Sequence, residues 1–326
     1  MKALRLHGTG DLRLHDEPAP EPRDGEVLVR VTAVGLCGSD RHWFLEGGIG
    51  DAALDRPLVL GHEFVGTIES GSRAGERVAL DPAVPCGRCS VCVAGNPHLC
   101  PDLRFAGHGS ADGALRTSLA WPERLAHALP DDLSDTEGSL LEPLGVALHA
   151  LDLAKARPGS TAGVFGCGPL GLLLAQALRA TGVETIVASD PLPHRANAAA
   201  SLGATLDDRE VDVAFEAAGD DAALADAMVA VRPGGRVVLV GIPDGDRTSF
   251  TASTARRKDL TLALCRRMKP ADLPRAIRLA EAGEVELGGL VSGRYALSEW
   301  REAFAELVER RGLKVVVEPQ RAGDAP

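Results

Sequence analysis

The segment from Cys37 to Glu63 contains three side-chain types that zinc accepts as ligands. Cys37 supplies a thiol, and His62-Glu63 supplies an imidazole followed by a carboxylate. A catalytic zinc ion is typically held by three protein ligands and keeps one position open for water or substrate. The residues therefore predict a catalytic metal site. The plainer alternative is a buried cysteine, a capping histidine and a surface glutamate.

A second group of cysteines has the sharpest spacing in the chain. Cys86, Cys89 and Cys92 are separated by two residues each, and Cys100 follows after seven more. Cysteines this close cannot all pair with one another without strain, whereas one tetrahedral zinc ion accepts four thiolates at about 2.3 Å. Four protein ligands leave no open position, so we expect a structural zinc site. An iron–sulfur cluster on the same thiolates is the alternative.

A glycine-rich turn follows the apolar stretch 162–165. The sequence Gly166-Cys167-Gly168-Pro169-Leu170-Gly171 separates this predicted strand from a predicted helix rich in alanine and leucine. In this order, GxGxxG lets the backbone approach a pyrophosphate, which then lies at the helix N-terminus. A tight surface turn is the plainer alternative.

The next predicted strand, 185–189, ends at Asp190. A dinucleotide-binding fingerprint has a carboxylate about 20 residues after its glycines, where it binds the ribose hydroxyls. An acid at this position repels a 2′-phosphate, so the sequence favours NAD over NADP. The expected cofactor-binding residues are Gly166, Gly168, Pro169, Leu170, Gly171, Asp190 and Arg195.

Length, composition and charge restrict the class of protein. A chain of 326 residues with 45% hydrophobic residues can form two domains with cores of their own. The formal net charge of -11 argues against a broad surface for nucleic acid or anionic membrane, so the expected partner is a small molecule. The N-terminus lacks an apolar signal-peptide region, and no uncharged run approaches a membrane span. We expect a cytoplasmic protein, in which clustered cysteines favour metal over disulfides.

Two kinds of element must position these residues. Short strands between tight turns, predicted at 4–14, 26–34, 64–68 and 76–80, indicate a small β-barrel or sandwich, with Cys37 and His62 in its loops. From residue 143 onward, strands at 162–165, 185–189, 211–216 and 236–241 alternate with helices, which indicates a parallel sheet. The connection 205–210 is too short for the expected crossover helix.

The order of these motifs resembles the medium-chain dehydrogenase/reductase family, the zinc alcohol dehydrogenases. Within it, the run from Cys37 to Trp43, the loop 48–51 and Glu142-Pro143-Leu144 resemble the polyol branch of sorbitol, xylitol and L-idonate dehydrogenases. The simple alcohol dehydrogenases of the family carry cysteine where Glu142 stands. The resemblance covers nearly the whole chain.

The resemblance implies an α/β fold in which a GroES-like β-rich catalytic domain is combined with a Rossmann domain, a doubly wound parallel sheet that binds NAD. The implied catalytic domain comprises 1–142 and 265–326, and the Rossmann domain comprises 143–264. The family often forms dimers and tetramers, so a homodimer or homotetramer is expected.

The resemblance also assigns roles to individual residues. It implies that Cys37, His62, Glu63 and Glu142 serve the catalytic zinc, with either carboxylate as the direct ligand. Ser39 matches the hydroxyl that carries the substrate proton toward solvent, and His42 extends this relay. Substrate contacts fall on Trp43, Glu142 and Arg266. Arg267 and Trp43 stand where sorbitol dehydrogenases often have tyrosine, which weakens a claim to sorbitol itself.

The resulting hypothesis is a zinc- and NAD-dependent oxidoreductase with two zinc ions per chain. It would oxidise a secondary hydroxyl of a polyol, sugar alcohol or sugar acid, reversibly, to the ketone. A secondary-alcohol dehydrogenase, or a threonine-type or biosynthetic amino-alcohol dehydrogenase, is the alternative among enzymes. A non-catalytic nucleotide-binding sensor on the same fold is the alternative from another class.

Overall fold

The computed structural model describes residues 1–109 and 111–322 and divides into two compact units. Unit 1 comprises Met1–Glu142 and Leu287–Pro326, and unit 2 comprises Pro143–Glu286. The family resemblance implied a return to the first domain at residue 265. In the structure, the segment from 265 to 286, which includes helix α9 (Asp272–Glu281), clusters with unit 2.

Mostly antiparallel strands form unit 1, although β18 and β19 pair in parallel. Over the described residues its largest sheet has seven strands, in the order β12-β8-β7-β3-β19-β18, with β11 paired to β3. Side chains of β3 alternate between buried and half-buried as far as Ala33, as expected of a strand with one face on the core. The bounds are β3 (Glu26–Gly35), β7 (Glu63–Ile68), β8 (Arg77–Leu80), β11 (Ser118–Pro122), β12 (Ala126–Ala128), β18 (Val291–Ala296) and β19 (Lys314–Glu318).

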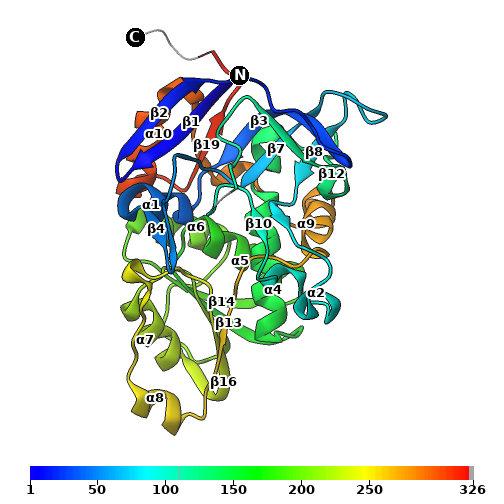
Figure 1. Ribbon diagram of the computed structural model, residues 1–326. Coiled ribbons are helices and arrows are strands. Elements are labelled where there is room, and N and C mark those ends of the chain that lie inside the picture. Colours follow the sequence, from blue (N-terminus) through cyan, green and yellow to red (C-terminus); the bar gives the residue numbers. More distant parts are fainter. Residues whose placement is uncertain (110, 323–326) are drawn as a thin grey trace. The chain divides into compact units, whose positions relative to one another are not determined.

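The strand order joins the two ends of the chain. β19 pairs antiparallel with the end of β3, with Val316 opposite Gly35, and β3 pairs with β7, with Gly35 opposite Glu63. Figure 1 shows β19, in red, beside β3 in blue. Three consecutive strands of one sheet therefore place Glu63 and the first residues of β19 on either side of Gly35.

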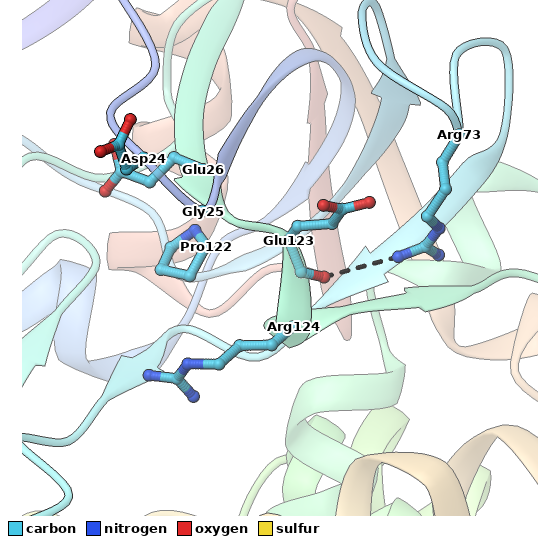
Figure 2. Close-up of a pocket in the computed structure, with 7 residues that line it drawn as sticks. All are labelled: Asp24, Gly25, Glu26, Arg73, Pro122, Glu123 and Arg124. Atoms are coloured by element: carbon cyan, nitrogen blue, oxygen red, sulfur yellow. Dashed lines mark hydrogen bonds between the residues drawn. The ribbon is translucent and has the colours of Figure 1, made fainter.

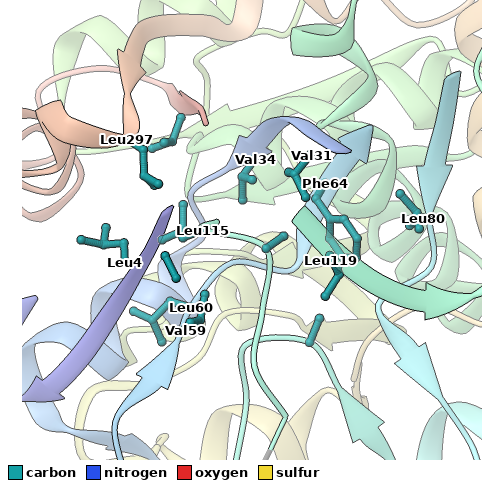
Figure 3. Close-up of a cluster of buried hydrophobic side chains, with 14 of the residues drawn as sticks. Leu4, Val31, Val34, Val59, Leu60, Phe64, Leu80, Leu115, Leu119 and Leu297 are labelled. Atoms are coloured by element: carbon teal, nitrogen blue, oxygen red, sulfur yellow. The ribbon is translucent and has the colours of Figure 1, made fainter. Parts of the chain in front are cut away.

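A continuous apolar cluster holds these strands. It includes Leu4, Val34, Phe64, Leu115 and Leu297, which come from distant parts of the chain (Figure 3). Val34 and Phe64 stand opposite each other in the β3–β7 ladder, directly beside the predicted metal ligands. Because interiors are close-packed, this cluster fixes the strand ends from which the site loops depart.

Smaller elements complete unit 1. Over the described residues, no helix of either unit is long and apolar enough to cross a membrane. The helices of unit 1 are α1 (Gly38–Glu46), α2 (Ser90–Val93), α3 (Asp135–Gly138) and α10 (Trp300–Glu309), and α4 (Leu141–Ala154) begins at its boundary. Its remaining strands are β1 (Lys2–Gly8), β2 (Asp11–Asp16), β4 (Gly48–Ile49), β5 (Ala52–Ala53), β6 (Leu58–Val59), β9 (Ala83–Val84) and β10 (Arg104–Phe105).

Unit 2 is built on a parallel sheet, in the order β14-β13-β15-β16-β17. This arrangement, together with the β-rich unit 1, confirms the predicted α/β fold class. The strands are β13 (Thr161–Phe165), β14 (Thr185–Ser189), β15 (Val211–Glu216), β16 (Val231–Leu239) and β17 (Thr261–Leu264). The helices are α5 (Pro169–Ala180), α6 (Pro193–Ser201), α7 (Asp221–Ala230), α8 (Ala252–Arg257) and α9.

The sheet of unit 2 has an abbreviated edge beside β14. Thr205 forms a single parallel bridge to Val187, in which Thr205 N donates to Ile186 O and Ala188 N donates to Thr205 O, both at 2.8 Å. Residues 206–210 then reach β15 without a helix. The short connection in the sequence thus corresponds to an edge strand reduced to one residue and to a crossover without its helix.

The glycine turn between β13 and α5 generates the first prediction. A Cβ atom on Gly171 would overlap the backbone oxygen of Gly166, whereas a Cβ on Gly168 would meet only Arg195 Nη1, at 3.5 Å. Gly171→Ala should therefore destabilise the protein by about 1–3 kcal/mol, as overpacking does. Gly168→Ala is the matched control and should keep the wild-type melting temperature in a thermal unfolding experiment. Equal melting temperatures for both variants would contradict this packing.

Candidate active site

Cys37 lies where β3 leaves the sheet and α1 begins. Its backbone N–H donates to Asp40 Oδ2 at 2.9 Å, and Gly61 N donates to the other oxygen of Asp40 at 3.2 Å. Asp40 is fully buried, and its Oδ1 lies 3.8 Å from His62 Nδ1. This carboxylate therefore joins the Cys37 loop to the segment that carries His62. The sequence analysis did not assign Asp40 a role.

The structure brings together the three predicted ligands of the first metal site. One ligand atom each from Cys37, His62 and Glu63 lies within 4.8 Å of the other two. His62 is 7% exposed and Glu63 is 1% exposed. A thiol, an imidazole and a carboxylate converging inside the protein form a donor set that fits zinc.

The electrostatics of this group also call for a cation. Burial raises the pKa of Cys37 to about 12, and the charge of Glu63 adds to the increase. A cysteine binds zinc as a thiolate, so for Cys37 a dication has to supply the stabilisation that water supplies to an exposed thiolate. Without a cation, the Cys37 thiol keeps its proton at neutral pH.

Glu63 has a partner that the sequence analysis missed. Lys314, at the start of β19, forms an ion pair with Glu63 Oε2, and both side chains are almost completely buried. Lys314 also opposes the rise in the pKa of Cys37 and of Glu142. A lone lysine ahead of the apolar run 315–317 was the only signal for it in the sequence.

Gly35 provides the space for this ion pair. A Cβ atom there would overlap Glu63 Oε2 and would lie 2.8 Å from Lys314 Cε. Because Gly35 stands between β7 and β19 in the sheet, only glycine lets the two side chains cross β3 and meet. The strand register therefore places a buried lysine next to a carboxylate of the candidate metal site.

Glu142 lies in the first turn of α4 and is 6% exposed. Burial raises its pKa to about 8; His62 opposes the increase, whereas Glu63 and Cys37 add to it. Its carboxyl is thus close enough to interact with the charges of the ligand group, although it is not among the three mutually close ligand atoms. A second carboxyl beside the group distinguishes this site from a simple Cys–His–Glu set.

The residues predicted for proton transfer lie on α1. Ser39 Oγ is 3.5 Å from His62 Nε2, within hydrogen-bonding distance. His42 is buried, and its Nδ1 lies 2.7 Å from Glu46 Oε1, whose side chain is 38% exposed. A hydroxyl beside the ligand group and a histidine–glutamate pair that reaches the surface therefore share one helix.

The predicted substrate residues differ in position. Trp43 is 1% exposed and belongs to the apolar cluster, where its ring packs edge-on against His108. It supports the site from the core and presents no free face to a ligand. Arg266 is exposed and follows β17 in unit 2. Arg266 therefore belongs to a different unit from the predicted metal ligands.

The four clustered cysteines fit a single tetrahedral ion. Cys86 Sγ lies 4.0 Å from Cys92 Sγ, Cys89 Sγ lies 3.9 Å from Cys100 Sγ, and all four sulfurs are within 4.8 Å of one another. None of the four forms a disulfide. Tetrahedral bonds of about 2.3 Å separate sulfurs by about 3.8 Å. This spacing suits one ion and leaves no room for a cluster of several irons and sulfides.

Backbone groups support thiolates in this cluster. N–H groups of Arg88 and Cys89 lower the pKa of Cys86 to about 6, whereas partial burial raises the pKa of Cys92 to about 12. Cys89 N and Cys92 N each donate to the sulfur three residues earlier, at 3.4 Å. Four adjacent thiolates repel one another unless a cation lies between them. The N–H donors stabilise negative charge on these sulfurs, which is the form that binds such a cation.

The dinucleotide-type turn leaves space for an anion. Gly166 has a φ of 101° and packs against Ala218, and Pro169 occupies the first turn of α5. The bare backbone of Gly168 faces the Arg195 guanidinium. A pyrophosphate fits between a helix N-terminus and a cation. Gly166, Gly168, Pro169, Leu170, Gly171 and Arg195 are therefore brought together.

Asp190 lies at the end of β14, beside the same turn. Its Oδ2 accepts a hydrogen bond from Cys167 N and its Oδ1 accepts one from Leu192 N, both at 2.8 Å. The two donors hold the carboxylate at the carboxyl edge of the sheet, where open α/β sheets bind ligands. The remaining lone pairs are available to hydroxyl groups.

A separate hollow lies elsewhere in unit 1. Its volume is about 660 Å³, and it is lined by Asp24, Gly25, Glu26, Arg73, Pro122, Glu123 and Arg124. Figure 2 shows Arg73 directed at the carbonyl of Glu123, and this guanidinium also binds both oxygens of Glu76. None of the candidate site residues lines this hollow, and one of its two arginines, Arg73, is occupied within the protein.

Comparisons with known proteins agree with this arrangement. Residues 23–131 match the alcohol dehydrogenase GroES-like domain, and residues 205–282 match the zinc-binding dehydrogenase family. The chain is 35% identical to sorbitol dehydrogenase of Bacillus subtilis, over 98% of each chain. It is 33% identical to the probable D-xylulose reductase A of Aspergillus clavatus, over 96% of this chain and 95% of the relative.

A solved structure shares the whole fold. It is an Escherichia coli oxidoreductase/dehydrogenase of unknown specificity, ECK1772, described as involved in membrane biogenesis. The TM-score is 0.90 at 30% identity, and the match covers 97% of this chain and 98% of that one. The two units are thus similar in fold to those of a solved oxidoreductase.

The cysteine cluster leads to a prediction about metal content. Cys92→Ser removes one of the four sulfurs and should cost the chain one of its two expected zinc ions, together with a lower melting temperature. Zinc per chain is measured by elemental analysis of purified protein. Cys265→Ser is the control, because this cysteine belongs to neither ligand group among the described residues. Unchanged metal content and melting temperature in Cys92→Ser would exclude the four-cysteine site.

The buried ion pair leads to a second prediction. Lys314→Met removes one partner, and an unpaired buried charge costs about 3–5 kcal/mol of unfolding free energy. The loss should be larger in chelator-stripped protein than in zinc-loaded protein, because a dication beside Glu63 replaces the missing positive charge. By linkage, zinc should bind this variant more tightly than it binds the wild type.

Denaturant unfolding of both forms, together with zinc competition titrations, checks these expectations. Lys314→Arg keeps the charge and should remain closer to the wild type. Lys2→Met removes an exposed lysine paired with Asp16, and should change the stability by less than about 1 kcal/mol. An equal loss in the stripped and loaded forms of Lys314→Met would show that Lys314 does not balance the charge of the metal site.

Proposed function

The chain belongs to the zinc-binding alcohol dehydrogenase family of medium-chain dehydrogenases, and we propose that it oxidises a secondary hydroxyl of a polyol, sugar alcohol or sugar acid to the ketone. NAD is the proposed hydride acceptor. The observation that carries the substrate class is the buried carboxyl of Glu142 beside the Cys37, His62 and Glu63 group. The sorbitol dehydrogenase and D-xylulose reductase relatives are named for a polyol and a ketose, which supports it.

Two zinc ions per chain are part of the proposal. Cys37 and His62 hold the catalytic ion together with Glu63 or Glu142, and the four clustered cysteines hold the structural ion. When bound, the catalytic zinc supplies Lewis acidity toward a substrate hydroxyl and NAD supplies the hydride acceptor. Unit 1 is the proposed catalytic domain, and unit 2 is the proposed cofactor domain.

Residues of α1 handle the proton. As the alcohol carbon loses a hydride, its hydroxyl loses a proton, and Ser39 Oγ, beside His62, is placed to accept it. His42 and Glu46 form the proposed onward route, since their close pair ends at a partly exposed carboxylate. Asp40 fixes the position of His62 relative to the Cys37 loop.

Other residues are proposed to bind NAD and to orient the substrate. The N-terminus of α5 and Arg195 hold the pyrophosphate of NAD, and Asp190 accepts hydrogen bonds from the ribose hydroxyls. Glu142 offers a carboxyl to a second, vicinal hydroxyl of the substrate, which a simple alcohol lacks. Arg266 offers an exposed guanidinium that suits the carboxylate of a sugar acid, and Trp43 supports the site from the core.

A homodimer or homotetramer is the proposed assembly. β17 lies at the end of the strand order in the sheet of unit 2, and its last residue, Leu264, is 76% exposed. An edge strand with an exposed leucine is normally covered in a folded protein. A second copy of the chain is the proposed cover.

A panel of substrates tests the proposed reaction. Purified zinc-loaded enzyme is assayed with NAD and sorbitol, xylitol, L-idonate, 2,3-butanediol, 2-propanol and threonine, and NADH absorbance is followed. The polyols or sugar acids should give the largest kcat/KM. Absence of NADH formation with every polyol and sugar acid, from protein that contains zinc, would refute the proposal, and highest kcat/KM with 2-propanol or threonine would favour the alternatives.

The proton route is tested in the same assay. Ser39→Ala should lower kcat by about 10²–10⁴, the usual contribution of a positioned proton acceptor. Ser39→Thr keeps a hydroxyl at the same position and should retain most of the activity. Both variants should bind zinc like the wild type, so a loss of metal in Ser39→Ala would instead indicate a structural role.

A further inference from the structure

A second hollow lies beside Asp190 in unit 2. Its volume is about 490 Å³, and it is lined by Ala188, Ser189, Asp190, Ala196, Leu206, Asp207 and Asp208. It adjoins the end of β14, next to the glycine turn, where the adenosine half of a dinucleotide binds in such folds. One wall is therefore the expected carboxylate end of β14, and the other wall comes from the segment 206–208.

The second wall exists because the sheet edge is abbreviated. After the single bridge at Thr205, the chain forms neither a longer edge strand nor a crossover helix. Leu206, Asp207 and Asp208 are consequently exposed beside the hollow rather than covered by such elements. Leu206, at 52% exposure, gives the hollow an apolar side chain that suits an adenine ring.

The charges around the hollow are mostly negative. Asp190 is held by the backbone N–H groups of Cys167 and Leu192, so its carboxylate has no cationic partner in these bonds. Asp208 has no hydrogen-bond or ion-pair partner among the residues that the structure describes. Two arginines adjoin the lining residues in sequence. Arg195 precedes Ala196 and faces Gly168 of the glycine turn. Arg209 follows Asp208 and is occupied by Asp207, to which its Nε and Nη2 donate at 2.5–3.0 Å.

We propose that Asp207 and Asp208 are specificity-determining residues that make the enzyme select NAD against NADP. The inference rests on the proposed dinucleotide site and extends it from Asp190 to the abbreviated edge. The adenosine ribose of NAD presents hydroxyl donors, which carboxylates accept. The 2′-phosphate of NADP would instead enter a hollow that three carboxylates line and beside which the Arg209 guanidinium is already paired with Asp207.

The two aspartates act in different ways. Asp208 only repels the 2′-phosphate of NADP. Asp207 contributes repulsion and also keeps Arg209 from forming the bidentate contact with phosphate for which a guanidinium is suited. Removal of Asp207 should therefore increase NADPH binding more than removal of Asp208 does, and the additional gain should require Arg209.

The experiment compares the dissociation constants of NADH and NADPH for the full-length, zinc-loaded protein by nucleotide fluorescence and calorimetry. The wild type should bind NADH at least about 100-fold more tightly than NADPH, since specificity here is built from repulsion. Asp208→Asn should lower this ratio by about tenfold, the order expected for one charge at close range in a partly exposed site. Asp207→Asn should lower it further, and Asp207→Asn with Arg209→Gln should return the ratio to the Asp208→Asn value.

The control is Asp226→Asn, which removes one exposed acid from α7 on the same unit and outside the hollow. This variant should leave the ratio of the NADPH and NADH dissociation constants unchanged. That result would show that the effect comes from repulsion inside the hollow and not from the net charge of the protein. Equal binding of NADH and NADPH by the wild type, or an unchanged ratio in both aspartate variants, would overturn the inference. Because no polyol enters the measurement, these outcomes leave the proposed reaction standing, whereas loss of all NADH binding would overturn both.

Discussion

The buried ion pair of Glu63 and Lys314 is the constraint on which the rest of unit 1 depends. A lysine and a glutamate at 2% and 1% exposure are each expensive to desolvate and are tolerable only together. Their meeting requires a glycine at position 35, the register of β7 on β3, and the pairing of β19 with β3. The sheet is therefore arranged around a charged group, and the apolar cluster of Figure 3 includes Val34 and Phe64, the chain neighbours of Gly35 and Glu63.

The two units suit ligands of opposite charge. Unit 1 buries Cys37 and Glu142, and this burial, together with the charge of Glu63, raises their pKa values, an effect that a cation would reverse. Unit 2 leaves backbone N–H groups and Arg195 around a glycine turn, which suits an anion. A dehydrogenase needs both, because it must stabilise an alkoxide-like charge on one partner and bind the diphosphate of the other.

Sequence alone predicted the features whose spacing is local. The four cysteines, GxGxxG with Asp190, and the segments of Cys37 and His62 all lie within short windows, so motif and periodicity were sufficient. The roles of Lys314 and Asp40 could not be predicted from the sequence, because strand register and loop contacts bring them to partners that are distant in the chain. Trp43 was predicted as a substrate contact, but its burial follows from core packing that no local pattern reveals. The abbreviated edge at Thr205 was visible as a short connection, whereas the hollow beside it depends on the fold.

The position of Lys314 in the last strand also has a consequence for biosynthesis. Cys37, His62, Glu63 and Glu142 all leave the ribosome well before β19 is translated, so the nascent chain carries a concentrated acidic and thiol-bearing segment without its internal counter-charge. Glu63 obtains this counter-charge only when β19 pairs with β3, so the charge balance of the site is completed by the last strand to be synthesised.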